Sequence, residues 1–266
     1  MSVYVVSLLA TVGGGCFALL LGRFLGTGRR AVAGEFGGQA QSLIGGVLLS
    51  SFILLTGFQV AGSWSALSDA RSGTYDEARA LADTYWAVGG LAPADRDRAR
   101  ALLRTYTDDV RTTEFHALAR GRTSPAAWRD LDAVRAAVWA APAGTAGPQA
   151  AKSAAQSALN TVYQTRTDRA AQVKGRMPRV TWIAMLVVGA FLVAFPALLG
   201  LTVTPRHLTA LCFVGAVVAF AICLSAQLNT AFRQPFGVRS TAFVLADTRF
   251  GQIDAGHYTL SPVPPR

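Results

Sequence analysis

The stretch "SSFILLTGFQVAGSW", residues 50–64, lies in an apolar run that is long enough to cross a bilayer. Polar and small side chains interrupt its phenylalanine, isoleucine and leucine residues. They are Ser50, Ser51, Thr56, Gly57, Gln59, Gly62 and Ser63. Lipid does not favour such residues, so the surface that they face decides whether this helix is a passive anchor or lines a path through the membrane.

Runs of this kind occur four times along the 266 residues. A membrane-spanning helix needs about 20 mostly apolar residues. Four stretches meet that need without any Asp, Glu, Lys or Arg: residues 3–21, 42–60, 180–201 and 208–228. The first has no basic segment before it and is longer than the apolar part of a signal peptide, so we expect it to be retained as a span.

The chain between the second and third spans is rich in Ala, Arg, Asp and Leu, which favours helices. Pro93 with its following acidic residues marks one helix start, and Ser124 before Pro125 marks another. We expect a further helix over residues 150–172. The second span is expected to continue as one long helix, with a packing face at helical spacing made of Ala70, Thr74, Ala78, Leu81 and Tyr85.

The predicted fold class is therefore all-α: an integral membrane protein with four transmembrane helices and a cytoplasmic helical bundle inserted between the second and third spans. It divides into a first transmembrane hairpin, a helical region, a second transmembrane hairpin and a C-terminal tail. The corresponding residues are 1–62, 63–179, 180–230 and 231–266.

We interpret the formal net charge of +10 as a guide to the orientation of the chain in the membrane rather than as a sign of nucleic-acid binding. The basic residues are spread out and no nucleic-acid recognition motif accompanies them. Arginines near the membrane are most numerous on the side that holds the helical region, although three lie in the first short loop. The positive-inside rule then places the N-terminus, residues 63–179 and the C-terminus in the cytoplasm.

Residues suited to catalysis or metal binding do not gather in a recognisable pattern. His116, His207 and His257 lack metal-ligand spacing, and the three cysteines fall in apolar runs without a CxxC pair. Nucleophile-elbow, zinc-protease and phosphate-loop motifs are missing. We predict no enzyme activity, no metal and no cofactor. The spans also lack the charges that coupled transporters place at mid-membrane, which favours a passive protein over a pump.

One line of the second span has small and apolar residues spaced by three or four positions. It consists of Gly46, Ser50, Leu54, Gly57 or Phe58, and Ala61. Small residues at this spacing commonly let two helices pack closely. The same line could instead be a pore wall, wide at Ser50 and narrowed by Leu54 and Phe58, which would gate by dewetting. Gln59 does not distinguish the two interpretations, because an amide near a helix end can also bond a neighbour.

Two carboxylates are expected on buried helix faces of the middle region. Glu114 falls on a helical line with Tyr106, Val110 and Leu118, and Glu77 borders the packing face of the preceding helix. A buried carboxylate needs a partner. The candidate partners are Arg104, Arg166 and Arg169. We interpret the two carboxylates as members of a structural ion pair, with ion coordination as the alternative.

Five motifs follow one another over most of the chain: "SLIGGVLLSSFILLTGFQVAGSW", "YDEARALADTYW", "LAPADRDRARALLRTYTDDV", "LNTVYQTRTDRAAQVKGRMPRVTW" and "QPFGVRSTAF". In order and spacing they resemble the bacterial bestrophin-like membrane family, a distant relative of the bestrophin anion channels. The resemblance implies four spans, a cytoplasmic helical middle, and a place in the bacterial plasma membrane. It also implies a homo-oligomer, a pentamer around a central anion pore. The partners would be the lipid bilayer, further copies of the chain and inorganic anions.

The resemblance also implies roles for residues of the second span. In bestrophins this span forms the pore neck, with apolar residues at i, i+4 and i+8 that end in a Gly-Phe-x-Val element, here residues 57–60. Carried over, the neck consists of Ser50, Leu54 and Phe58. Residues at the pore mouth or in helix packing are then Gly57, Gln59 and Trp64. Ser50 departs from the apolar pattern, and the calcium-binding acidic cluster of animal bestrophins has no counterpart beyond Asp247 and Asp254.

We therefore expect a passive ion channel that conducts anions and is formed by a symmetric oligomer with the second span lining the pore. The alternative is a non-conducting integral membrane protein whose cytoplasmic helical region binds a partner or senses the state of the membrane.

Overall fold

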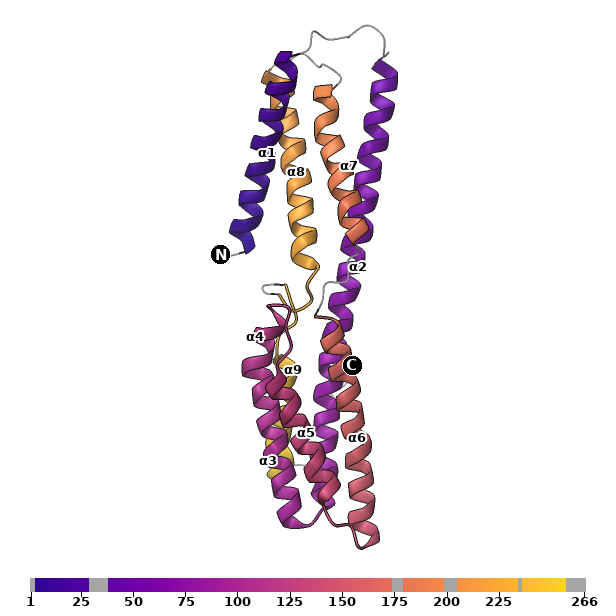
Figure 1. Cartoon of the computed structure of the whole chain (residues 1–266), viewed down its shortest axis with the longest axis vertical. Helices are drawn as coiled ribbons and strands as arrows, with labels where there is room; N and C mark the ends of the chain where they lie inside the picture. Colours follow the sequence, from indigo (N-terminus) through magenta and orange to yellow (C-terminus); the bar gives the residue numbers. More distant parts are fainter. Residues whose placement is uncertain (1–2, 29–37, 174–178, 199–204, 234–235, 257–266) are drawn as a thin grey trace, which may run out of the picture. The chain divides into compact units, whose positions relative to one another are not determined.

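A computed structural model describes residues 3–28, 38–173, 179–198, 205–233 and 236–256, and within them the chain is helical with no β-strand (Figure 1). The chain forms two compact units. The first, here called the apolar unit, consists of Met1–Ala66 and Gly175–Thr230. The second, the polar unit, consists of Leu67–Lys174 and Ala231–Arg266. The long helix α2, Gly38–Ala87, contributes its first half to the apolar unit and its second half to the polar unit.

The apolar unit contains α1 (Val3–Gly28), the first half of α2, α7 (Arg179–Leu198) and α8 (Pro205–Leu228). Each of the four predicted spans therefore falls on a helix, although residues 199–201 of the third lie outside the described residues. Two described helical stretches are long and apolar enough to cross a membrane, Ser42–Gly90 and Leu208–Leu228. The first and third predicted spans give shorter apolar helical stretches, Val5–Leu20 and Val180–Phe195.

Helices α1 and α8 pack side by side in the apolar unit, and glycine permits their close approach (Figure 1). A Cβ atom at Gly14 would lie 2.7 Å from the carbonyl oxygen of Gly215, and one at Gly215 would lie 2.6 Å from the Cβ of Ala18. Contacts this short cannot be relieved by a rotamer change where the neighbour is backbone. Near one end of the pair, the amide Nε2 of Gln227 donates a hydrogen bond to Oγ of Ser7 at 2.9 Å.

The polar unit is a bundle formed by the second half of α2 and several shorter helices. They are η1 (Val88–Gly90), α3 (Pro93–Asp109), the π-helical turn η2 (Val110–Glu114), α4 (Phe115–Leu118), α5 (Pro125–Ala140), α6 (Ala146–Ala171) and α9 (Thr241–Asp254). The predicted helix starts are confirmed: Pro93 occupies the first turn of α3, and Oγ of Ser124 accepts a hydrogen bond from the backbone N–H of Ala127. Helix α6 begins earlier than the expected residue 150.

The core of the polar unit confirms the predicted packing face of α2. Its five residues, Ala70, Thr74, Ala78, Leu81 and Tyr85, are all buried. The C-terminal segment, which we expected to be a tail over residues 231–266, contributes α9, and this helix packs into the same core. The buried side chains of α9 are Ala242, Phe243, Ala246, Phe250 and Ile253. The apolar residues of α9 recur at helical spacing, and the apolar face that they form is buried against the other helices of the core.

Candidate functional site

The line of residues on α2 that sequence analysis singled out faces away from the other helices of the apolar unit. The side chains of Leu54 and Phe58 are 59% and 71% exposed, and Ser50 and Gly57 are also exposed. Trp64, seven residues after Gly57 and hence on the same helix face, is exposed as well. Apart from its chain neighbours and the adjacent turns of α2, no described residue has an atom within 4 Å of a Cβ built on Gly57. This face has no packing partner among the described residues of the chain.

The opposite face of α2 packs into the apolar unit. Phe52 is buried and lies 3.4 Å from the position of a Cβ on Gly189 of α7. Gln59 and Ser63 are buried on the same side, and the amide of Gln59 has no hydrogen-bond partner among the described residues. The polar residues of the opening stretch thus divide between two faces. Gln59 belongs to the inward face, whereas Ser50 and Gly57 belong to the outward one.

The polar unit contains a closed network of four charged side chains and one tyrosine hydroxyl, here called the charge ring: Glu77, Tyr106, Glu114, Arg166 and Arg169. Arg166 donates two hydrogen bonds to Glu114, from Nη1 to Oε2 at 2.7 Å and from Nη2 to Oε1 at 2.8 Å. Nη2 of Arg169 bridges the two carboxylates, 3.1 Å from Oε1 of Glu77 and 3.1 Å from Oε2 of Glu114. The Tyr106 hydroxyl donates to Glu77 at 2.6 Å and accepts from Arg166 at 2.8 Å. All five side chains are buried.

Every main helix of the polar unit contributes to the charge ring or covers it. Glu77 comes from α2, Tyr106 from α3, Glu114 from η2, and both arginines from α6. The guanidinium of Arg166 lies 4.5 Å from the ring centroid of Trp128 on α5, and that of Arg169 lies 5.1 Å from the ring centroid of Phe243 on α9. These cation–π contacts further stabilise the buried charges.

The electrostatics of the charge ring favour a structural role. Burial raises the pKa of Glu77, and the nearby Arg169, the hydrogen bond from Tyr106 and the charge of Arg166 only partly offset it. Burial and the charge of Glu77 hold the pKa of Tyr106 well above its ordinary value. Both carboxylates are engaged by guanidinium groups. No group of three His, Cys, Asp or Glu side chains among the described residues is placed to hold a metal.

A second cluster, here called the α9 clasp, holds the C-terminal helix: Tyr85, Arg100, Arg104, Phe250 and Asp254. The Tyr85 hydroxyl donates to Oδ2 of Asp254 at 2.6 Å, and Arg104 donates to the same oxygen at 2.8 Å. Arg100 donates to Oδ1 at 2.9 Å. The rings of Tyr85 and Phe250 stack with their centroids 4.2 Å apart. This cluster links α2, α3 and α9 within the polar unit.

The α9 clasp corrects one expectation. Arg104, predicted as a possible partner of Glu77 or Glu114, pairs instead with Asp254 and with Asp247 at 3.1 Å. Burial disfavours the charged form of Asp254, but the hydrogen bonds from Tyr85 and Arg104 and the charge of Arg100 outweigh it and hold the pKa of this carboxyl below its usual range. Asp247 and Asp254 therefore act as partners of arginine, which sequence reasoning missed.

Comparison with known proteins agrees with the helical architecture. The family model of the Bestrophin-like domain matches residues 15–243. None of the curated proteins is a match for the sequence. A crystal structure of a bacterial bestrophin homologue from Klebsiella pneumoniae is similar to this structure, with a TM-score of 0.62, 15% identity, and coverage of 96% of this chain and 98% of that chain. This similarity shows a common fold. Because the family model matches most of its length, the chain belongs to the bestrophin-like family.

Proposed function

We propose that this chain is one subunit of a passive anion channel, in which a symmetric homo-oligomer surrounds a central pore lined by α2. The observation that carries the proposal is the outward face of α2. Leu54 and Phe58 are large, apolar and unpartnered within the subunit, and they alternate with the small residues Ser50, Gly57 and Ala61. A purely lipid-facing helix has no need of such small residues, whereas helices around a shared axis do.

The side chains on this face of α2 determine which residues would form the neck of the proposed pore. Phe58 and Leu54 are one helical turn apart, so each would form one ring of apolar side chains in a symmetric assembly. Apolar rings resist hydration and form a gate by dewetting. Ser50, one helical turn before Leu54, would line a wider part of the pore that water can wet. Gly57 and Trp64 would lie beside the neck, whereas the buried amide of Gln59 would contribute to helix packing.

Charge and family membership support anions as the permeant ions. The chain has a formal net charge of +10, and an excess of basic groups raises the local concentration of anions. A lone subunit has too few spans to enclose a pore, so conduction requires assembly. Five subunits is the number that the resemblance to bestrophins implies. In this proposal all four apolar helices span the bacterial plasma membrane, and the polar unit and both termini lie in the cytoplasm.

The test is ion flux through purified protein in liposomes, made on a preparation whose oligomeric state has been measured. We expect chloride flux, and a reversal potential in a KCl gradient that follows chloride rather than potassium. A verified oligomer that passes neither ion would instead favour the alternative, a non-conducting membrane protein whose polar unit binds a partner.

A further inference from the structure

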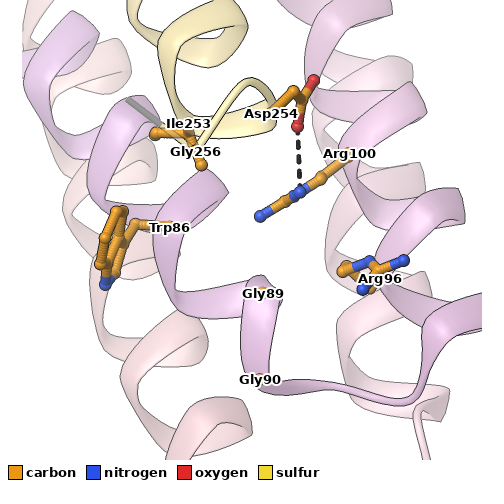
Figure 2. Close-up of a pocket in the computed structure, with 8 residues that line it drawn as sticks. All are labelled: Trp86, Gly89, Gly90, Arg96, Arg100, Ile253, Asp254 and Gly256. Atoms are coloured by element: carbon orange, nitrogen blue, oxygen red, sulfur yellow. Dashed lines mark hydrogen bonds and ion pairs between the residues drawn. The ribbon is translucent and has the colours of Figure 1, made fainter. Parts of the chain in front are cut away.

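A pocket in the polar unit lies apart from both the charge ring and the outward face of α2. Its volume is about 400 Å³, within the size range of small-molecule sites. Figure 2 shows that it is bounded by the end of α2 and η1, the first turns of α3 and the end of α9. The lining residues are Trp86, Gly89, Gly90, Arg96, Arg100, Ile253, Asp254 and Gly256.

Two arginines supply positive charge to this pocket. Arg100 extends from α3 into the space between the helices, as Figure 2 shows, and only its Nη1 is bound to Asp254. Its Nε is buried and has no partner among the described residues. Arg96, one turn earlier on α3, uses its Nε for the exposed Asp97 at 2.8 Å, which leaves the Nη groups of Arg96 as donors. Only Asp254 among the lining residues is acidic, and its charge is shared with Arg104 and Tyr85.

The remaining lining residues are one aromatic residue, Trp86, one aliphatic residue, Ile253, and three glycines. Trp86, which is 51% exposed, lies on one side of the pocket. Gly89 and Gly90 form the adjacent turn. A Cβ at Gly89 would lie 3.1 Å from Nη2 of Arg100, and one at Gly90 would lie 2.7 Å from the Cβ of Ala151. Glycine at these positions therefore keeps the pocket open beside the Arg100 guanidinium and lets η1 approach α6.

We propose that this pocket binds a small organic anion, with a carboxylate or a phosphate held by Arg96 and Arg100 and a flat ring packed against Trp86. Guanidinium groups bind both kinds of oxyanion through paired, charge-assisted hydrogen bonds. An exposed indole offers a large apolar surface to a planar partner. A bound oxyanion shares Arg100 with Asp254, so the pocket connects the ligand directly to the α9 clasp.

Isothermal titration of the full-length protein in detergent tests this proposal with four probes: phenyl phosphate, benzoate, inorganic phosphate and benzylamine. We expect phenyl phosphate or benzoate to bind several-fold more tightly than inorganic phosphate, and benzylamine not to bind. A preference between the first two identifies the oxyanion. Arg96→Gln should weaken binding of the ring-bearing anions about tenfold, the effect of losing one charge-assisted hydrogen bond. Trp86→Leu should weaken their binding but not that of inorganic phosphate.

The matched control is Arg122→Gln, which removes an exposed arginine of the polar unit that does not line the pocket. It should leave every affinity unchanged. Arg96 is on the surface and outside the α9 clasp, so its substitution tests the pocket without loss of the fold, which an unchanged melting temperature verifies. Absence of binding by both ring-bearing anions, or equal weakening by Arg96→Gln and Arg122→Gln, would overturn the proposal. The readout is binding, so the result does not depend on whether the protein conducts.

Discussion

Arg166 and Glu114 form a two-point ion pair at 2.7 and 2.8 Å although their side chains are only 1% and 2% exposed. The pair joins α6 to the π-helical turn that ends at Glu114. A turn of this kind accommodates an extra residue in a helix and is frequent at functional sites. In this chain it lies between Tyr106 and Leu118 on a line of buried residues, so it aims a carboxylate, rather than an apolar side chain, into the bundle.

Removal of the Glu114 charge should strongly destabilise the polar unit. Glu114→Gln leaves the buried guanidinium of Arg166 without its anion, and loss of one partner of a buried pair costs about 3–5 kcal/mol. Circular dichroism of the full-length protein during unfolding in urea measures this loss. The control is Asp108→Asn, which breaks the exposed Arg111–Asp108 pair and should change the free energy of unfolding by no more than about 1 kcal/mol. Similar losses in both variants would contradict a stabilising charge ring.

Glu77 should give the stability of the polar unit a distinctive dependence on pH. Its pKa is raised above the ordinary 4.5 in the folded protein, mainly by burial. The protonated form is therefore the one that folding favours. Its contribution to stability is fully present below pH 4.5 and is lost as the pH rises through the folded pKa. Of the groups that face it, Arg169, Tyr106 and Arg166 lower the pKa of Glu77. The charge of Glu114 raises it.

The variant Glu77→Gln is uncharged at every pH and should escape that loss. Relative to the native protein, its destabilisation should shrink as the pH is raised from about 4.5 to 8. Melting temperatures of the two proteins in detergent over this range make the comparison. A difference that is constant, or that grows with pH, would show that Glu77 does not titrate in the predicted direction.

The close contact of α1 with α8 predicts different effects on stability for alanine substitutions at two adjacent glycines. Gly14→Ala places a methyl group against the backbone of Gly215 and should destabilise the apolar unit by about 1–3 kcal/mol, the usual cost of overpacking. Gly13→Ala meets no atom within 4 Å and should be neutral or slightly stabilising, because alanine favours helix. The melting temperatures of the two variants in detergent provide the test. Equal effects would mean that the two helices are not in tight contact.

Local patterns were sufficient to predict the helical fold and part of the buried polar chemistry. Helical spacing identified the packing face of α2, and the need of Glu114 for a partner correctly indicated Arg166 and Arg169. Such spacing carries no information about residues that meet only in the folded bundle. Tyr85 and Asp254, which are 169 positions apart, are one example. Regular helical spacing also did not predict the π-helical turn at Val110–Glu114.

The outward face of α2 illustrates a different limit. Sequence spacing placed Ser50, Leu54 and Phe58 on one line, and the structure of the single chain leaves all three exposed. What a helix face contacts in an assembly depends on other subunits, which neither local propensity nor the fold of one chain determines.

The most direct measurement is the rate of chloride flux through liposomes that contain Phe58→Ala, compared with native protein and with Phe213→Ala. Phe213 on α8 is a matched control, since its side chain is 72% exposed against 71% for Phe58. A pore neck at Phe58 predicts a several-fold faster flux for Phe58→Ala, because the smaller side chain widens and wets the constriction. Phe213→Ala should conduct at the native rate. Equal flux through all three proteins at equal amounts of oligomer would contradict a pore lined by α2.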